Sequence, residues 1–244
     1  MGSIGKEFME YTKKQYDIES DQKKGIDQPP LEVHVDHSIP LIILPKFEKS
    51  CYKEASLVDA IVTRQSLRKY EDKPLSLKEL GAMLFATQGV KQVISTRSTR
   101  RTVPSAGSRH AFETYMLINK VEGLKNGIYK YVALKHALIE INTEEGMTDK
   151  ITNACLGQEF VRDSAVTFIW IAVVNRMTWR FGERSYRYLL LDAGHVCQNL
   201  YLISEALGCG ACAIAAYNDD EMNKILGIDG EEQFTIYAAS VGKK

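Results

Sequence analysis

The stretch Tyr186–Leu207, YRYLLLDAGHVCQNLYLISEAL, decides how this chain folds. Its apolar residues recur every three or four positions, which places them on one stripe of an α-helix: Leu189, Ala193, Val196, Leu200, Ile203 and Leu207. At about 1.5 Å per residue this helix would be roughly 33 Å long. Its other side is also largely apolar, with Leu190, Leu191, Cys197, Tyr201 and Leu202. We therefore expect its own domain to cover one side and a second copy of the chain to cover the other.

A membrane span would also be apolar all round, but the middle of this stretch carries Asp192, His195, Gln198 and Asn199. An aspartate at the centre of a bilayer costs about 2.5–3.5 kcal/mol, whereas a leucine returns only about 0.3–0.6 kcal/mol. The membrane interpretation is therefore rejected. Gly208 and Gly210 end the helix, because glycine tolerates the left-handed conformation at a helix terminus.

Composition indicates an ordinary globular protein. Of 244 residues, 45% are apolar and 25% are charged, and 31 basic residues balance 31 acidic ones, so no global basic field favours nucleic acid. The N-terminus lacks the apolar segment of a signal peptide, and an odd number of cysteines, five, favours reduced thiols. We expect a cytoplasmic location. Cys209 and Cys212 have the spacing of a redox dithiol, but apolar neighbours favour packing over redox chemistry or zinc.

The rest of the chain reads as an α+β layer fold. Residues 4–16 predict an amphipathic helix, and residues 17–50, which contain Pro29, Pro30, Pro40 and Pro45, predict an extended arm. We expect helices at 56–62, at 76–87 with a Ser76–Glu79 capping box, at 145–157 and at 219–226. Strands are expected at 112–121, 165–174, 211–217 and 234–242, with a hairpin over 127–141 and a basic loop over 95–102. We divide the chain into an N-terminal helix with the extended arm, 1–50, and a single domain, 51–244.

Arg64, Ser66 and Arg68 are spaced by two, so in an extended segment all three would lie on one side. Two guanidinium groups and a hydroxyl suit a phosphate, because arginine forms bidentate charge-assisted hydrogen bonds with it. A solvated edge explains the same spacing equally well. We leave both interpretations open on spacing alone.

Two other stretches could approach a planar ligand. The turn Pro104–Ser105–Ala106–Gly107 and the small residues Ala211, Ala213, Ala215 and Ala216 leave backbone accessible, or else only form a turn and pack beneath a helix. Lys243 and Lys244 are ordinarily a solvated end. His34 and His37 lack further ligands and predict no metal site. Asp192 and His195, three apart on one helix face, are interpreted as structural polar groups.

Five segments together resemble the nitroreductase family, and most of all its SagB-type dehydrogenase branch. They are R-x-S-x-R-x-Y at 64–70, LFATQG at 84–89, PSAGSRH at 104–110, GIYKY at 127–131 and the long stretch through Gly208. Their order and spacing carry the resemblance over roughly residues 55–244. It implies a nitroreductase-like α+β fold with a mostly antiparallel central sheet flanked by helices, and a homodimer whose interface contains the long helix.

The resemblance also implies one flavin mononucleotide (FMN) per subunit at that interface. Its phosphate would meet Arg64, Gln65, Ser66 and Arg68, with Lys243 and Lys244 joining more loosely. Pro104, Ser105, Ala106 and Gly107 would reach the flavin from the partner subunit, and a backbone N–H near Ala215–Ala216 would address flavin N5. Chemistry would then belong to the flavin, and no catalytic side chain is expected.

One departure from the branch bears on the reaction. Its azoline-oxidising members carry a Lys-Tyr pair just before the glycine that precedes the central helix, whereas this chain reads Arg180-Phe181-Gly182. Phenylalanine has no hydroxyl, and arginine is a poor base. The sequence therefore favours an FMN-dependent enzyme that passes hydride from NAD(P)H to a nitroaromatic or quinone. The alternatives are a SagB-type peptide azoline dehydrogenase and a flavin-binding module without turnover.

Overall fold

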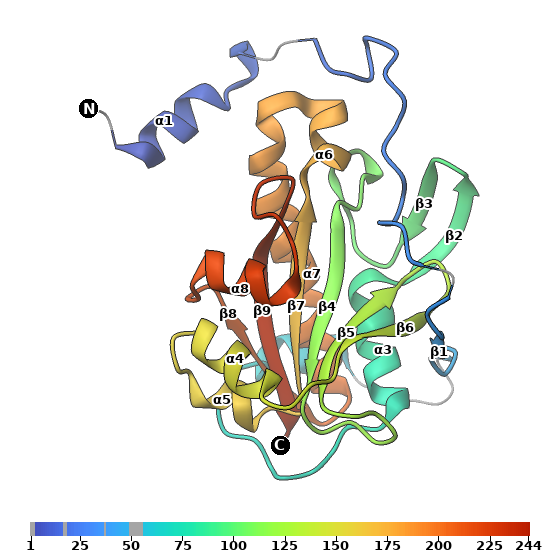
Figure 1. Ribbon diagram of the computed structural model, residues 1–244, viewed down its shortest axis with the longest axis vertical. Coiled ribbons are helices and arrows are strands. Elements are labelled where there is room, and N and C mark those ends of the chain that lie inside the picture. Colours follow the sequence, from blue (N-terminus) through green and yellow to red (C-terminus); the bar gives the residue numbers. More distant parts are fainter. Residues whose placement is uncertain (1–2, 17–18, 37, 49–55) are drawn as a thin grey trace.

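A seven-stranded sheet forms the centre of the molecule (Figure 1). The computed structural model describes residues 3–16, 19–36, 38–48 and 56–244. The strand order is β1-β6-β5-β4-β7-β9-β8, and each neighbouring pair is antiparallel. The strands are β1 (Ile42–Ile43), β4 (Phe112–Ile118), β5 (Gly127–Val132), β6 (Ala137–Asn142), β7 (Val166–Val173), β8 (Cys209–Ile214) and β9 (Gln233–Lys243). The predicted antiparallel α+β fold is confirmed.

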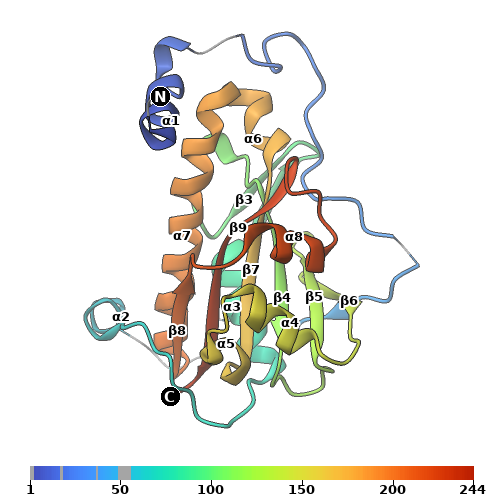
Figure 2. The same ribbon diagram turned by 60° about the vertical axis from the view of Figure 1, so that its left-hand side comes forward.

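Helices cover both faces of this sheet, as the two views in Figures 1 and 2 show. One face packs against α3 (Leu77–Gln88) and the long α7 (Ser185–Ala206), and the other packs against α4 (Met147–Ala154), α5 (Glu159–Asp163) and α8 (Asp219–Leu226). Each face has its own cluster of buried apolar side chains. The buried strand β7 contributes to both clusters, which explains why its sequence is apolar without alternation.

The long helix follows its sequence pattern closely. Leu189, Ala193, Val196 and Leu200 are at most 4% exposed, so the predicted stripe faces the sheet. On the other side of the helix, burial differs from residue to residue. Cys197 and Tyr201 are buried, whereas Leu190 and Leu191 are 56% and 61% exposed. The exposed leucines leave part of α7 uncovered by the described residues of its own chain.

A buried acid fixes the N-terminal arm to the sheet. Glu113 of β4 is 4% exposed, lies 3.0 Å from Lys130 Nζ and 2.6 Å from Arg176 Nη2, and accepts the Val33 backbone N–H at 3.0 Å. Burial alone would raise the pKa of Glu113, but the Arg176 and Lys130 charges hold it below its usual value. Removing one partner of such a buried pair typically costs about 3–5 kcal/mol.

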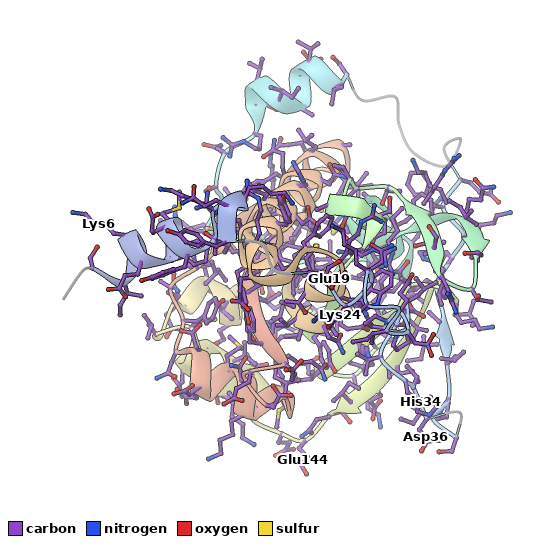
Figure 3. The ribbon with its side chains drawn as sticks, turned by 90° about the horizontal axis from the view of Figure 1, so that it is seen from above. Lys6, Glu19, Lys24, His34, Asp36 and Glu144 are labelled. Atoms are coloured by element: carbon purple, nitrogen blue, oxygen red, sulfur yellow. The ribbon has the colours of Figure 1, made fainter. Side chains whose placement is uncertain are left out.

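Other buried side chains hold the arm through its backbone. The donors are Trp179 Nε1 to the Ile26 carbonyl (2.8 Å), Arg176 Nε to the Pro30 carbonyl (2.9 Å) and Arg101 Nη2 to the Leu31 carbonyl (3.5 Å). Between residues 19 and 36 the arm contains no helix or strand, as expected from its prolines. Figure 3 shows His34 and Asp36 at the outer edge of the molecule, and His37 lies outside the described residues.

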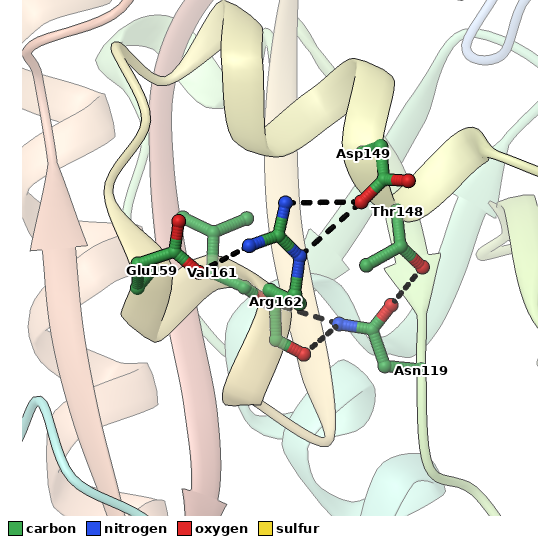
Figure 4. A network of polar contacts seen from close by, with 6 residues as sticks. All are labelled: Asn119, Thr148, Asp149, Glu159, Val161 and Arg162. Atoms are coloured by element: carbon green, nitrogen blue, oxygen red, sulfur yellow. Dashed lines mark hydrogen bonds and ion pairs between the residues drawn. The ribbon is translucent and has the colours of Figure 1, made fainter.

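A polar network at the end of β4 fixes the position of α5 (Figure 4). Asn119 Nδ2 donates to the backbone carbonyls of Val161, at 3.0 Å, and Arg162, at 3.3 Å, while its Oδ1 accepts from Thr148 at 2.7 Å. Arg162 in turn binds Asp149 of α4 at 3.0 Å and also Glu159. The helix that carries Phe160 is thereby tied to both β4 and α4.

Several local predictions are confirmed and others are wrong in extent. The capping box of α3 forms, because Glu79 N donates to Ser76 Oγ at 3.2 Å and Ser76 N donates to Glu79 Oε2 at 2.9 Å. The predicted helix 4–16 is shorter: α1 spans Ile4–Tyr11, and the following Thr12 carbonyl accepts from Arg184, the residue just before α7, at 2.9 Å. The remaining residues form only a 3-10 turn, η1 (Lys14–Tyr16).

Two further segments differ from their predictions. The expected basic loop is a hairpin, in which β2 (Val90–Ser95) pairs with β3 (Ser98–Arg101) through a two-residue turn. The helix α6 (Val174–Phe181) and the 3-10 turn η4 (Gly182–Arg184) lie between β7 and α7, where no helix was predicted. The helix α2 (Leu57–Thr63) lies at the periphery of the molecule in Figures 2 and 3, and Thr63 at its end donates to Glu205 of α7 at 3.3 Å. No described helix has the length and apolarity that crossing a bilayer requires.

Candidate functional site

The segment 64–70 runs along the free edge of β8. Leu67 N donates to the Ala211 carbonyl at 2.9 Å, and Glu71 N donates to the Lys243 carbonyl at 3.0 Å. A Cβ on Gly210 would come within 2.3 Å of Leu67, so this strand accepts the segment only because it has a glycine there. The segment therefore pairs with the edge of β8, and these hydrogen bonds hold its backbone in place.

Tyr201 of α7 organises the first half of this segment. Its hydroxyl hydrogen bonds with Ser66 Oγ at 2.9 Å and accepts the Ala213 backbone N–H at 2.8 Å. The Arg64 guanidinium lies over the same ring, 5.1 Å from its centroid. Arg64 and Ser66 therefore lie together at the end of α7, beside β8.

Arg68 turns the other way. Its guanidinium lies 5.9 Å from the ring centroid of Phe160 in α5, on the opposite face of the sheet from α7. Both Arg68 and Gln65 are exposed. Within the described chain, neither Arg64 nor Arg68 forms an ion pair with a carboxylate, so both positive charges are available to an anion.

The two lysines at the end of β9 are already paired. Lys243 Nζ binds Glu79, and Lys244 Nζ lies 2.6 Å from Glu205 Oε2. Burial opposes the charge on Lys243, but the Glu79 carboxylate raises the pKa of this lysine overall. These lysines therefore reach the same corner of the molecule as Arg64, with their charges balanced.

The end of β8 is open to solvent. The strand ends at Ile214, three residues before the predicted end, so Ala215 and Ala216 follow it as exposed residues. The Ala216 carbonyl accepts from Gln158 Nε2 at 2.9 Å, which fixes the path of the chain there. A planar ligand would meet backbone rather than bulky side chains at this point.

The turn 104–107 lies beside the other half of α7. The Ala106 backbone N–H is 3.2 Å from both carboxylate oxygens of Asp192, and Ser105 Oγ accepts the His110 backbone N–H at 2.9 Å. Burial raises the pKa of Asp192, and the hydrogen bonds from Ser105 and Ala106 oppose that rise. Gly107 has a φ of 55°, within the left-handed region that favours glycine.

Within the described chain, the corner with Arg64 and Ser66 and the turn 104–107 lie far apart. Asp192 and Tyr201 are nine residues apart on one helix, a separation of about 13 Å along its axis. The basic corner with Arg64 and Ser66 lies near one end, and the turn 104–107 lies toward the other. A site built from both groups of a single chain would have to span that distance.

Two important residues carried little signal in the sequence. Tyr201 was recognised only as part of an apolar face, although its hydroxyl joins Ser66 to β8. Phe160, beneath Arg68, gave no signal at all. Asp192 was interpreted as structural, and its observed partner is a backbone N–H.

Among the residues that the structure describes, no group of three or more histidine, cysteine or acidic side chains is placed to hold a metal ion.

The fold and this arrangement define an α+β protein with a nitroreductase-like fold. A solved structure of a protein from Ralstonia eutropha, named as a nitroreductase, superposes with a TM-score of 0.69 at 22% identity and covers 89% of this chain and 98% of that one. A nitroreductase-named protein of Desulfovibrio desulfuricans, solved in complex with FMN, has a TM-score of 0.54 at 16% identity, covering 78% and 87%.

The chain belongs to the nitroreductase family, whose sequence model matches residues 61–243. It is 34% identical over 192 residues to MJ1384 of Methanocaldococcus jannaschii, which is named for the same family, covering 79% of this chain and 93% of that protein. It is also 25% identical over 138 residues to McbC of Escherichia coli, a microcin B17-processing protein, covering 54% and 50%. The protein is thus a nitroreductase-family oxidoreductase with relatives in the SagB-type branch.

Proposed function

We propose that this protein is an FMN-dependent oxidoreductase that takes hydride from NAD(P)H and delivers it to a small oxidised acceptor, such as a nitroaromatic or a quinone. The observation that carries the proposal is the basic corner beside β8. There Tyr201 joins Ser66 to the Ala213 backbone, and Arg64 lies over the tyrosine ring without an acidic partner among the described residues.

The residues at this corner fit a phosphate monoester. Arg64 and Ser66 would hold it, with the exposed Gln65 between them in sequence. Arg68 lies toward Phe160 and would have to turn from that ring to reach the same phosphate. Charge-assisted hydrogen bonds from arginine to phosphate are about twice as strong as neutral ones. Lys243 and Lys244 fit less directly, because a phosphate would have to compete with Glu79 and Glu205 for them.

The open end of β8 supports the remaining part of the site. When bound, the flavin would supply the hydride chemistry, and the protein would supply orientation and electrostatics. The exposed backbone at Ala215 and Ala216 would offer hydrogen bonds to the ring system. Small residues there leave room for one flat molecule at a time, so donor and acceptor would bind in turn.

We infer a homodimer from the separation of the two groups of residues on α7. The turn Pro104–Gly107 of one chain would complete the site of its partner, and the exposed Leu190 and Leu191 would lie in the interface. A cytoplasmic location also remains our proposal. It agrees with the free, buried thiols of Cys155, Cys197, Cys209 and Cys212.

The second candidate is a peptide azoline dehydrogenase, which the similarity to McbC favours. The residues Arg180 and Phe181 argue against it. Neither side chain offers the phenol or the neutral amine that would accept a proton from the substrate. Conversion of an azoline peptide to the azole by the purified protein would decide for this candidate.

The absorption spectrum of the purified protein, followed by stopped-flow reduction with NAD(P)H, tests the proposal. We expect a bound flavin that bleaches with NAD(P)H and returns with a nitroaromatic or quinone. A flavin that binds but does not bleach would indicate a module without turnover, and failure to bind FMN would refute the cofactor.

Arg64→Ala tests the corner itself. The loss of a charge-assisted hydrogen bond of roughly 1.5–3 kcal/mol should weaken FMN binding about ten- to a hundredfold. Arg97→Ala is the control, because its side chain is 70% exposed on the β2–β3 hairpin. Equal FMN affinity in the two variants would show that 64–68 is only a solvated edge.

A further inference from the structure

The end of α6 lies directly on the turn 104–107. A Cβ on Gly107 would come within 2.8 Å of Phe181 Cζ and within 3.0 Å of both Cδ and Nε of Arg180. The close approach therefore depends on the glycine, whose φ of 55° is itself unfavourable for other residues. Arg180 and Phe181 border whatever binds against this turn.

Three arginines surround this contact, and each guanidinium lies over an aromatic ring. Arg180 lies 5.5 Å from the centroid of Phe181, Arg109 lies 5.3 Å from that of Trp179, and Arg184 lies 5.5 Å from that of Tyr188. Phe181 and Tyr188 also contact each other edge to face, with centroids 4.9 Å apart. We call Arg109, Arg180 and Arg184 the arginine cluster.

The cluster has an excess of positive charge. Within the described chain, none of its three guanidinium groups forms an ion pair with a carboxylate. The acid at the turn, Asp192, binds the Ala106 backbone N–H instead. Arg109 is 8% exposed, and burial together with the Arg180 charge lowers its pKa. Positive charges that lie close together without a counter-ion repel one another, and an anion that binds among them relieves this repulsion.

The three arginines differ in how far the described residues already occupy them. Arg109 Nε donates to the Gly107 carbonyl at 3.1 Å. Arg184 donates to the Tyr188 hydroxyl at 2.9 Å and to the Thr12 carbonyl at 2.9 Å. Arg180 is exposed and makes no hydrogen bond to the described residues. It sits on a fixed helix, since the preceding Trp179 is anchored to the arm by its hydrogen bond to Ile26.

We propose that Arg180, with Arg109 behind it, binds a carboxylate or phosphate group of the molecule that reacts at this site, and so determines specificity for anionic ligands. A planar guanidinium binds either group in bidentate geometry. The inference rests on the proposed oxidoreductase function, which makes the turn 104–107 part of the site. The anion belongs either to the acceptor, as a carboxylate, or to the nicotinamide donor, as a phosphate.

Arg180→Ala distinguishes these sources in two kinetic arms. The acceptor arm compares 4-nitrobenzoate with the neutral 4-nitrobenzamide, and the donor arm compares NADPH with NADH. We expect kcat/KM for the charged member of one pair to fall about ten- to a hundredfold while its neutral or less charged partner stays within about twofold. Arg180→Lys should retain part of the preference, and Arg97→Ala should retain all of it.

A binding measurement separates this inference from the proposed function. Calorimetric titration with benzoate and with inorganic pyrophosphate is run on the protein as purified, with or without flavin. Weaker binding of one anion by Arg180→Ala would support anion recognition even if no turnover is found. Equal binding by both proteins, or an equal loss of kcat/KM for both members of each pair, would overturn it. A protein that fails to bind flavin would refute only the proposed reaction.

Discussion

Replacing Tyr201 by phenylalanine removes a single oxygen at the point where α7, β8 and the segment 64–70 meet. That hydroxyl accepts the Ala213 N–H at 2.8 Å and hydrogen bonds with Ser66 at 2.9 Å. Tyr201 is 8% exposed, so water does not readily replace what is lost. The ring beneath Arg64 is retained, and the substitution therefore tests the hydroxyl alone.

The expected loss of stability follows from the unpaired N–H of Ala213. Ala213 is partly buried, and leaving a donor that water reaches poorly without an acceptor costs about 1–3 kcal/mol. For a chain of this size each kcal/mol shifts the midpoint of thermal unfolding by about 2–4 °C, so Tm should fall by about 2–12 °C. Ser66 also loses its anchor, which should weaken FMN binding roughly two- to tenfold.

The assay pairs thermal unfolding, followed by circular dichroism without flavin, with a fluorescence titration of FMN. Tyr16→Phe is the matched control, because its hydroxyl makes one exposed hydrogen bond to Glu10, at 3.1 Å. Its Tm and FMN affinity should equal those of the unmodified protein. If Tyr201→Phe also matched the unmodified protein in both measurements, the hydroxyl would not join the edge segment to the strand.

Three further predictions concern the turn, a buried histidine and the interface. Gly107→Ala should lower the unfolding free energy by about 1–2 kcal/mol in urea titrations, because φ is 55° and its Cβ would meet Phe181; an unchanged midpoint would contradict the contact. Burial and two arginine charges lower the pKa of His110 to about 3, so stability should be lost as pH falls from 6.5 toward 3, and His110→Gln should reduce that loss between pH 7 and pH 5. Leu191→Asp should yield monomers by light scattering with weakened FMN binding, whereas a flavin-loaded dimer of this variant would place the interface elsewhere.

Local pattern predicted the elements whose side chains interact with near neighbours in sequence. The stripe on α7 and the Ser76–Glu79 capping box depend on spacings of three and four residues, and both are confirmed. The hairpin of β5 and β6 was predicted as well. In each case the interaction that stabilises the element lies within the element or next to it.

Prediction failed where distant contacts decide the outcome. Val174 continues the apolar run of β7, so the sequence did not show that a helix begins there. The hairpin at 90–101 has few apolar residues and was interpreted as a loop. In an extended segment Arg64 and Arg68 would lie on one side. Instead, Arg64 lies over the Tyr201 ring of α7 and Arg68 lies near the Phe160 ring of α5, and these two helices cover opposite faces of the sheet. The division at residue 50 and the assigned FMN contacts remain predictions.

Side chains of the rest of the protein hold the N-terminal arm by its backbone. Trp179, Arg176 and Arg101 bind its carbonyl oxygens, and its Val33 N–H binds Glu113. Every residue of a chain presents a carbonyl, so these contacts do not depend on which side chains the arm carries. These four contacts would therefore survive most substitutions within the arm, whereas substitutions in β4, β3 and α6 would remove them. A synthetic arm that keeps its prolines, Gln28 and Glu32 should follow the same path, because Gln28 donates to the Arg97 carbonyl and Glu32 accepts the Leu134 N–H.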